Sequence, residues 1–230
     1  LFVVLTLFLL DRDRQRYGRN FFLAAVVCGL ATGTKYMGLF FFLAVPLYLL
    51  WGIFEKKIDP RRALGLATLF VLLLAAALLA SNPLLLLPQE RAEIIATQRL
   101  QFQQTNLGYW TVNNAAYITW GSYPEDFRLH YGEAWFLLLA LIGLGVGIWR
   151  KERRLTHVLI LAYALPYMLY FLFIATTRRT HYFLPAMLPL FSCLINLLPT
   201  SLPRRKPAWG QWARWAALLL VLVQVGLFVR

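Results

Sequence analysis

The sequence predicts an all-α fold, a polytopic membrane helix bundle, and three observations lead to that prediction. Hydrophobic residues make up 60% of the 230 residues, well above the roughly 45–50% of globular domains. Apolar runs that approach the length of a membrane span recur along the chain. Basic clusters follow them on every second loop, as the excess of Lys and Arg on cytoplasmic loops predicts for a multi-pass protein.

The basic residues concentrate in four clusters, which hold sixteen of the 23 Lys and Arg. They are Arg12, Arg14, Arg16 and Arg19; Lys56, Lys57, Arg61 and Arg62; Arg150, Lys151, Arg153 and Arg154; and Arg204, Arg205, Lys206 and Arg214. Orientation in the membrane and contact with anionic lipid headgroups explain these clusters. The net charge of +13 therefore does not predict a nucleic-acid partner.

Eight spans are predicted when the apolar runs are compared with a hydrocarbon core that needs ~20 helical residues. They cover residues 1–10, 21–34, 37–54, 63–80, 133–149, 157–175, 182–200 and 213–229. The first run is too short to cross and begins without Met or a charged flank. We therefore expect residues 1–230 to form a single transmembrane domain that is a C-terminal fragment of a longer protein.

The least certain boundary lies within residues 21–54, which could form one tilted helix plus an interfacial piece. Two spans with a tight turn at 34–36 are predicted, because a single span would put the later basic clusters on the wrong face. With the clusters cytoplasmic, the external face receives three connections. They are residues 34–36, 81–132 and 176–181.

The connection at 81–132 is too long for a plain linker and is predicted to be an external amphipathic and aromatic loop. Asn82-Pro83 should end the preceding helix. Residues 88–104 mix polar and apolar side chains, which suggests an amphipathic helix at the interface or across the mouth of the bundle. Residues 108–131 are rich in aromatics, and they fit either an ordered loop re-entering the headgroup zone or a simple aromatic belt.

Small residues inside the apolar runs are expected to serve packing. Cys28 and Cys193 have no metal-ligand spacing and do not suggest a disulfide framework. Gly143, Gly145 and Gly147 form a GxGxG pattern inside a predicted span, where small residues usually let helices approach closely. Neither feature predicts a cofactor.

Lys35 is a cation in an unexpected place. The arm that leads to it, residues 21–34, would be about 21 Å long at 1.5 Å per residue, so Lys35 should lie in the outer leaflet or the bundle mouth. An unpaired lysine there often marks a substrate or ion path, although an ammonium that snorkels to the headgroups is the alternative. The neighbouring residues offer close backbone approach and hydroxyl donors: Gly29, Thr32, Gly33, Thr34, Tyr36 and Gly38.

Arg178, Arg179 and His181 form a second unexpected group, on a short external loop where the charge rule disfavours cations. Arginine binds phosphate through two parallel hydrogen bonds, so an anion is expected here. Two solvated arginines that touch outer-leaflet phospholipid are the alternative. Pro185 and Pro189 follow, and they are expected to interrupt the next helix and free carbonyls that face a cavity or a neighbour.

External carboxylates are scarce, and none has the spacing of a metal site. They are Glu90, Glu93, Glu125, Asp126 and Glu133. Glu125-Asp126 is the best candidate for acid or base chemistry, but after Tyr123-Pro124 the pair is predicted to form a turn.

Three segments together carry a family resemblance. They are GLATGTKYMGLFFFLAVPLYLL at 29–50, SNPLLLLP at 81–88 and RRTHYFLPAMLPL at 178–190. In their order and spacing the sequence resembles the membrane-embedded C-type glycosyltransferases that use polyprenyl-phosphate sugars. The branch it resembles contains the protein O-mannosyltransferases and the aminoarabinose transferases.

The resemblance implies transfer of a sugar from undecaprenyl- or dolichyl-phosphate to an unknown acceptor on the external face. No cofactor is predicted, and the sequence does not indicate a divalent metal but leaves a metal requirement open. Lys35, Arg178 and Arg179 would bind the donor phosphate, and the resemblance implies three helpers: Tyr36, His181 and Tyr182. His181 departs from the family, which commonly has Arg there. The family's general base, an Asp in the first external loop, has no match and would lie upstream of Leu1.

Two other classes stay open at this point. A flippase or transporter of a phosphate-bearing lipid would also need cations, but it often has inverted repeats, and none is seen. A structural subunit would leave Lys35 and the Arg pair unexplained. The expected location is the cell membrane, most simply the cytoplasmic membrane of a prokaryote, with membrane lipids as neighbours.

Overall fold

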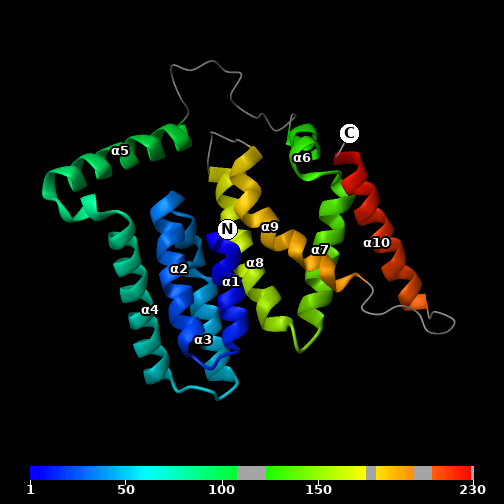
Figure 1. Ribbon diagram of the computed structural model, residues 1–230, viewed down its shortest axis with the longest axis horizontal. Coiled ribbons are helices and arrows are strands. Elements are labelled where there is room, and N and C mark those ends of the chain that lie inside the picture. Colours follow the sequence, from blue (N-terminus) through cyan, green and yellow to red (C-terminus); the bar gives the residue numbers. More distant parts are fainter. Residues whose placement is uncertain (108–122, 175–179, 199–208, 229–230) are drawn as a thin grey trace.

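The chain forms a bundle of helices, seen in the computed structural model of Figure 1, which describes residues 1–107, 123–174, 180–198 and 209–228. Every regular element in these ranges is helical, so the predicted all-α fold is confirmed. The predicted runs match helices, with boundaries shifted by a few residues. Three stretches are long and apolar enough to cross a membrane: Met37–Phe54, Pro60–Ser81 and Arg154–Ile174. Among the described residues three further apolar helices are shorter, at 10–17 residues.

The first half of the bundle consists of four helices and a short 3₁₀ segment. They are α1 (Phe2–Asp13), α2 (Arg19–Lys35), η1 (Met37–Phe42), α3 (Ala44–Phe54) and α4 (Pro60–Ser81). Helix α2 packs against both α1 and α4. The separation of residues 21–54 into two helices is confirmed, because α2 ends at Lys35 and the chain reverses into η1 and α3.

Local sequence explains both ends of α4. Asp59 accepts a hydrogen bond from the backbone N–H of Arg62 at 2.9 Å, and Pro60 occupies the first turn, where its missing N–H costs nothing. At the other end the helix stops at Ser81, as Asn82-Pro83 predicts. The chain continues through η2 (Pro83–Leu86).

The second half of the bundle consists of α7 (Ala134–Trp149), α8 (Arg154–Leu169) with its π-helical extension η4 (Tyr170–Ile174), η5 (Thr180–Phe183), α9 (Leu184–Ser192), η6 (Cys193–Asn196) and α10 (Trp209–Phe228). The expectation that Pro185 and Pro189 interrupt a helix is wrong. Pro185 lies in the first turn of α9, where no N–H is needed, and Pro189 lies inside the helix, which continues to Ser192.

The segment at 81–132, which is predicted to be external, differs from its prediction in two ways. Residues 88–104 are indeed helical, within α5 (Pro88–Leu107), which leaves the end of α4 at a steep angle (Figure 1). At 100° per residue, however, Ile94, Ile95 and Leu100 point in different directions, so α5 has no apolar face. The predicted turn at Glu125-Asp126 is also wrong, because α6 (Tyr123–Tyr131) is a helix. The rest of the aromatic loop, residues 108–122, lies outside the described residues.

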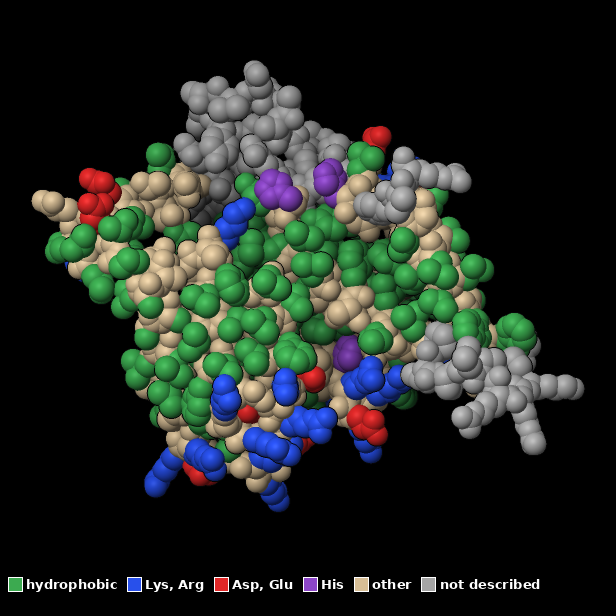
Figure 2. All heavy atoms as spheres, viewed as in Figure 1, with side chains coloured by type: hydrophobic (Ala, Val, Ile, Leu, Met, Phe, Trp, Pro, Cys, Tyr) green, Lys and Arg blue, Asp and Glu red, His purple; other side chains and the backbone are tan. Residues whose placement is uncertain are grey.

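Basic residues gather at one end of the bundle. The connections α1–α2, α3–α4 and α7–α8, which carry the first three basic clusters, meet at the lower end of Figure 1. Figure 2 shows the Lys and Arg side chains concentrated there, below a broad apolar surface. Residues 204–206 of the fourth cluster lie outside the described residues. We call this end the basic end and the opposite end, where α2 finishes, the Lys35 end.

Glycine and buried amides let the helices of each half approach closely. A Cβ on Gly29 would collide with the Leu74 carbonyl of α4 and would lie 2.7 Å from the Ala77 Cβ. Gly143 lies directly against the Cys193 carbonyl, and its own carbonyl accepts a bond of 3.1 Å from the Asn196 side chain. Gly147 faces the ring of His157. The predicted packing role is confirmed for Gly143 and Gly147, whereas Gly145 faces open space.

The two cysteines are free and buried, as predicted. Cys28 donates to the Gly38 carbonyl at 3.3 Å, and Cys193 contacts the Pro189 carbonyl at 3.5 Å.

Helix α10 docks on the rest of the bundle through a buried polar residue. Gln224 is 4% exposed, and its Oε1 accepts a hydrogen bond of 3.2 Å from the backbone N–H of Glu133, at the start of α7. Gly132, with φ of 94°, brings the backbone close to this amide. A side chain at this position would collide with Gln224.

Candidate functional site

Lys35 is the last residue of α2, and its side chain is exposed at the end of the bundle. Tyr36 follows in the left-handed conformation, with φ of 55°, and its N–H bonds to the Thr32 carbonyl at 2.9 Å. This closes the helix and turns the chain into η1. Neither ion pair of the described residues includes Lys35, so no carboxylate in this part of the chain pairs with its ammonium.

Close backbone packing holds the Lys35 turn. A Cβ on Gly38 would collide with the Cys28 carbonyl and the Thr32 hydroxyl, so η1 can lie directly on α2 only because residue 38 is glycine. A Cβ on Gly33 would lie 2.6 Å from the side-chain nitrogen of Asn82, at the end of α4. The predicted use of these glycines for close approach is confirmed.

A chain of aromatic contacts joins this turn to η5. The rings of Phe40 and Tyr167 are 4.7 Å apart, and those of Phe171 and Tyr182 are 5.4 Å apart. The Tyr167 hydroxyl donates to the Tyr182 carbonyl at 2.6 Å. We call these four residues, Phe40, Tyr167, Phe171 and Tyr182, the aromatic ladder.

The ladder brings two of the predicted site segments to the same end of the molecule. Lys35 and Tyr36 lie just before Phe40, and the His181 ring contacts the Tyr182 ring at 4.5 Å. His181 is exposed and Tyr182 is half-buried. Arg178 and Arg179, predicted to bind phosphate with them, lie outside the described residues.

Partial burial raises the pKa of Tyr36 above its ordinary value. A tyrosine hydroxyl is protonated at neutral pH even without this shift, so it is available as a hydrogen-bond donor. A neutral phenol beside an ammonium suits an anion with several oxygen atoms, because both groups donate.

Sequence reasoning missed the residues that build the ladder, since Phe40 and Tyr167 carry no charge. One signal could have indicated them. Tyr163, Tyr167 and Phe171 recur every four residues along α8 and its extension η4, which puts them on one face. That face contacts η1 through Phe40 and Phe41.

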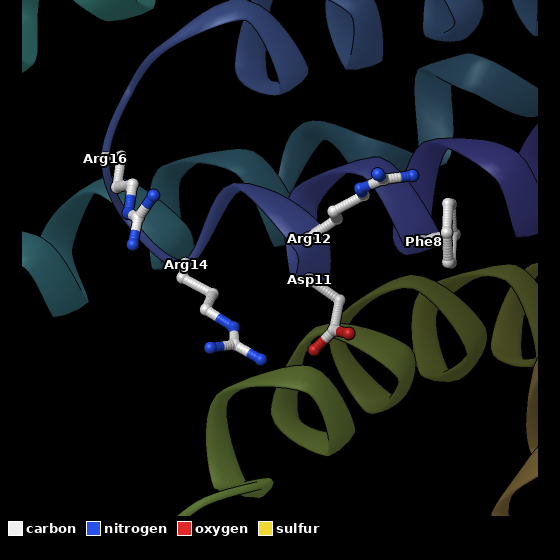
Figure 3. Close-up of a pocket in the computed structure, with 5 residues that line it drawn as sticks. All are labelled: Phe8, Asp11, Arg12, Arg14 and Arg16. Carbon is white, nitrogen blue, oxygen red and sulfur yellow. The ribbon is translucent and has the colours of Figure 1, made fainter.

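No group of three His, Cys, Asp or Glu among the described residues is placed to hold a metal ion. Glu133 lies 3.8 Å from Arg128, and Glu125 is exposed in the first turn of α6. A separate open pocket of about 430 Å³ lies at the basic end, lined by Phe8, Asp11, Arg12, Arg14 and Arg16 (Figure 3). It is not the predicted site, which is at the other end.

The apolar helices that are long enough to cross a bilayer mark the chain as a membrane protein. More particularly, residues 2–87 match the family model described as dolichyl-phosphate-mannose-protein mannosyltransferase. This match confirms the resemblance to the superfamily of membrane glycosyltransferases and supports, at a coarse level, an enzyme that uses a lipid-linked sugar donor. No curated protein and no solved structure matches the chain.

The matched segment runs from α1 to the end of η2 and contains Lys35, Tyr36 and the SNP triplet at 81–83. The stretch at 178–182 lies beyond it.

Proposed function

We propose that the chain takes part in moving a sugar from a polyprenyl-phosphate donor to an acceptor on the external face of the membrane. The observation that carries this proposal is Lys35, which is exposed, unpaired among the described residues and located inside the segment that matches the mannosyltransferase model. The Lys35 end would be external, because the opposite, basic end carries the excess of Lys and Arg that is typical of cytoplasmic loops.

The surroundings of Lys35 suit an amphiphilic donor. Leu39 and Phe42 of η1 are 54% and 64% exposed, and they follow the cation within two helical turns. A phosphate held at Lys35 would leave its isoprenoid chain beside these apolar side chains, in the lipid. A water-soluble sugar phosphate would gain nothing from them.

In the proposed reaction the acceptor displaces the phosphate at the anomeric carbon. The bond from that carbon to the phosphate oxygen breaks as the bond to the acceptor forms, and negative charge grows on the leaving phosphate. Lys35, with Arg178 and Arg179, would stabilise that charge, and the hydroxyls of Tyr36 and Tyr182 would donate to it. His181 would add charge only when protonated. We assign no general base within the chain.

Replacing Lys35 by alanine tests the donor site. Because a hydrogen bond to a charged group contributes ~1.5–3 kcal/mol, the dissociation constant for undecaprenyl phosphate should rise about 10- to 150-fold. Native mass spectrometry of the protein in neutral detergent would measure it. Lys151→Ala is the matched control, since Lys151 is exposed at the basic end, and its affinity should not change.

Equal affinities for Lys35→Ala and the unmodified chain would show that Lys35 does not bind the donor and that its ammonium only extends to the lipid headgroups. Thermal unfolding of both variants can be monitored through labelling of the buried Cys28 and Cys193, which become accessible as the chain unfolds. Equal unfolding temperatures would show that a loss of affinity does not come from misfolding.

A further inference from the structure

The turn that follows α1 alternates between buried and exposed side chains. Asp13, Gln15 and Tyr17 are buried, at 3%, 5% and 5% exposure. Arg14 and Arg16, which stand between them, are exposed. The turn therefore has a polar inner side, which contacts α3, and a cationic outer side.

Hydrogen bonds fix the inner side. The Asp13 carboxylate accepts from the backbone N–H of Tyr17 at 2.9 Å, from that of Gly18 at 3.1 Å and from the Tyr48 hydroxyl at 2.7 Å. The Tyr48 oxygen in turn accepts from the N–H of Gln15 at 2.7 Å. Tyr48 is fully buried in α3, so the turn is tied to the core of the first half of the bundle.

The backbone of this turn is held in an unfavourable conformation. Arg14, Gln15 and Tyr17 have φ of 51°, 58° and 55°. Residues other than glycine, asparagine and aspartate rarely adopt this left-handed region. Three such residues within four positions persist only where the surroundings hold them, and such strain often accompanies a binding function.

The outer side faces the pocket of Figure 3. Arg12, Arg14 and Arg16 line it with Phe8, and none of the three guanidinium groups belongs to an ion pair of the described residues. The remaining lining residue, Asp11, points toward α8 in Figure 3 and accepts from the Thr156 hydroxyl. The pocket thus combines three guanidinium groups that lie outside the ion pairs of the described residues with one carboxylate that already accepts a hydrogen bond. One of the three, that of Arg12, lies 6.0 Å from the centre of the Phe8 ring.

We propose that this pocket binds the phosphate headgroup of an anionic phospholipid in the leaflet at the basic end. Guanidinium groups recognise phosphate oxygens by charge and by paired hydrogen bonds. The apolar side of the site is also present, because Val4, Leu5 and Phe8 are 38%, 36% and 50% exposed along α1. The headgroup would contact the arginines, and an acyl chain would lie along this helix.

The test uses the whole chain in neutral detergent with phosphatidylglycerol as the probe and phosphatidylcholine as the neutral reference, by native mass spectrometry. Loss of a hydrogen bond between a charged side chain and a phosphate weakens binding by about tenfold or more. The double variant Arg14→Gln, Arg16→Gln should therefore bind the first phosphatidylglycerol at least ~10-fold more weakly, with phosphatidylcholine unchanged.

The double variant Arg61→Gln, Lys151→Gln is the matched control. It removes the same charge from exposed positions at the same end without touching the pocket, and it should change the affinity less than twofold. Equal losses in the two double variants would overturn the proposal, because binding would then follow total charge.

Tyr48→Phe tests whether the buried network positions the arginines. It removes no charge and lies outside the pocket, yet loss of the bonds to Asp13 and Gln15 should weaken phosphatidylglycerol binding between about twofold and tenfold. An unchanged affinity would overturn the positioning role.

Inorganic phosphate distinguishes a lipid ligand from a free anion. At 10 mM it should leave phosphatidylglycerol bound, since it lacks acyl chains to contact α1. Displacement of the lipid by phosphate at that concentration would overturn the assignment to a lipid.

Discussion

The two ends of the bundle present cations by different means. At the basic end, buried polar groups centred on Asp13 hold a strained turn, and arginines project from its outer side. At the Lys35 end, the described contacts that hold the turn are mostly glycine packing and aromatic rings, and a hydrogen bond from Tyr167 to the Tyr182 carbonyl joins it to η5.

The difference suggests how each end tolerates change. When a buried carboxylate that accepts from three donors is removed, all three donors lose their acceptor at once, so the loss of stability is large. Apolar contacts lose stability in proportion to the volume and fit that are lost. The comparison therefore predicts a large, localised sensitivity at the basic end and smaller, distributed sensitivities at the Lys35 end.

The largest expected effect is that of Asp13→Ala. It leaves the N–H groups of Tyr17 and Gly18 and the Tyr48 hydroxyl without their acceptor, which should lower the free energy of unfolding by ~3–5 kcal/mol. Labelling of the buried cysteines during a thermal ramp in detergent would measure the shift. Asp59→Ala, an exposed helix cap at the same end, should cost only about 1 kcal/mol; equal costs would remove the contrast between a buried network and a surface cap.

Gly38→Ala should have the next largest effect and would test packing at the Lys35 end. The added methyl group meets the Cys28 carbonyl and the Thr32 hydroxyl, so η1 must move away from α2 at a cost of about 1–3 kcal/mol. The same thiol labelling applies. Gly145→Ala is the control, because no atom of the described residues lies within 4 Å of its Cβ position, and it should be neutral or stabilising by up to ~1 kcal/mol. Identical shifts for both variants would mean that close approach does not hold this turn.

Tyr167→Phe should have the smallest effect and would isolate the bond that joins the ladder to η5. Loss of the hydrogen bond to the Tyr182 carbonyl should cost about 1 kcal/mol of unfolding free energy. Tyr163→Phe is a matched control four residues away on the same helix, because the Tyr163 hydroxyl is buried without a hydrogen-bond partner among the described residues. It should be neutral or slightly stabilising, and a larger loss there than at residue 167 would contradict the role of the ladder.

Helix positions were largely predictable because they depend on local rules. Asn82-Pro83 ends α4 where proline disfavours a helix before it, and the charge alternation correctly required two helices within residues 21–54. The helix at 123–131 was missed because Pro124 and the acidic pair suit the first turn of a helix as well as a β-turn. The absence of an apolar face on α5 could have been read from the sequence by assigning 100° to each residue.

The buried network at the basic end could not be predicted. Asp13 stands among arginines and looks like part of a solvated charged loop, and its partner Tyr48 is 35 residues away inside an apolar run. Only the folded chain brings them together. The candidate site was partly predictable, because Lys35 and Tyr36 stand out by charge against an apolar background, whereas Phe40 and Tyr167 resemble any other core aromatics.

The buried amide of Gln224 has a consequence for biogenesis. A helix that enters a bilayer alone must hide or hydrate such a group, since hydrocarbon offers it no partner. In the assembled bundle the amide accepts from the N–H of Glu133 at the start of α7. Insertion of α10 is therefore most favourable once α7 is in place to receive it, so this contact favours an order in which the membrane helices assemble.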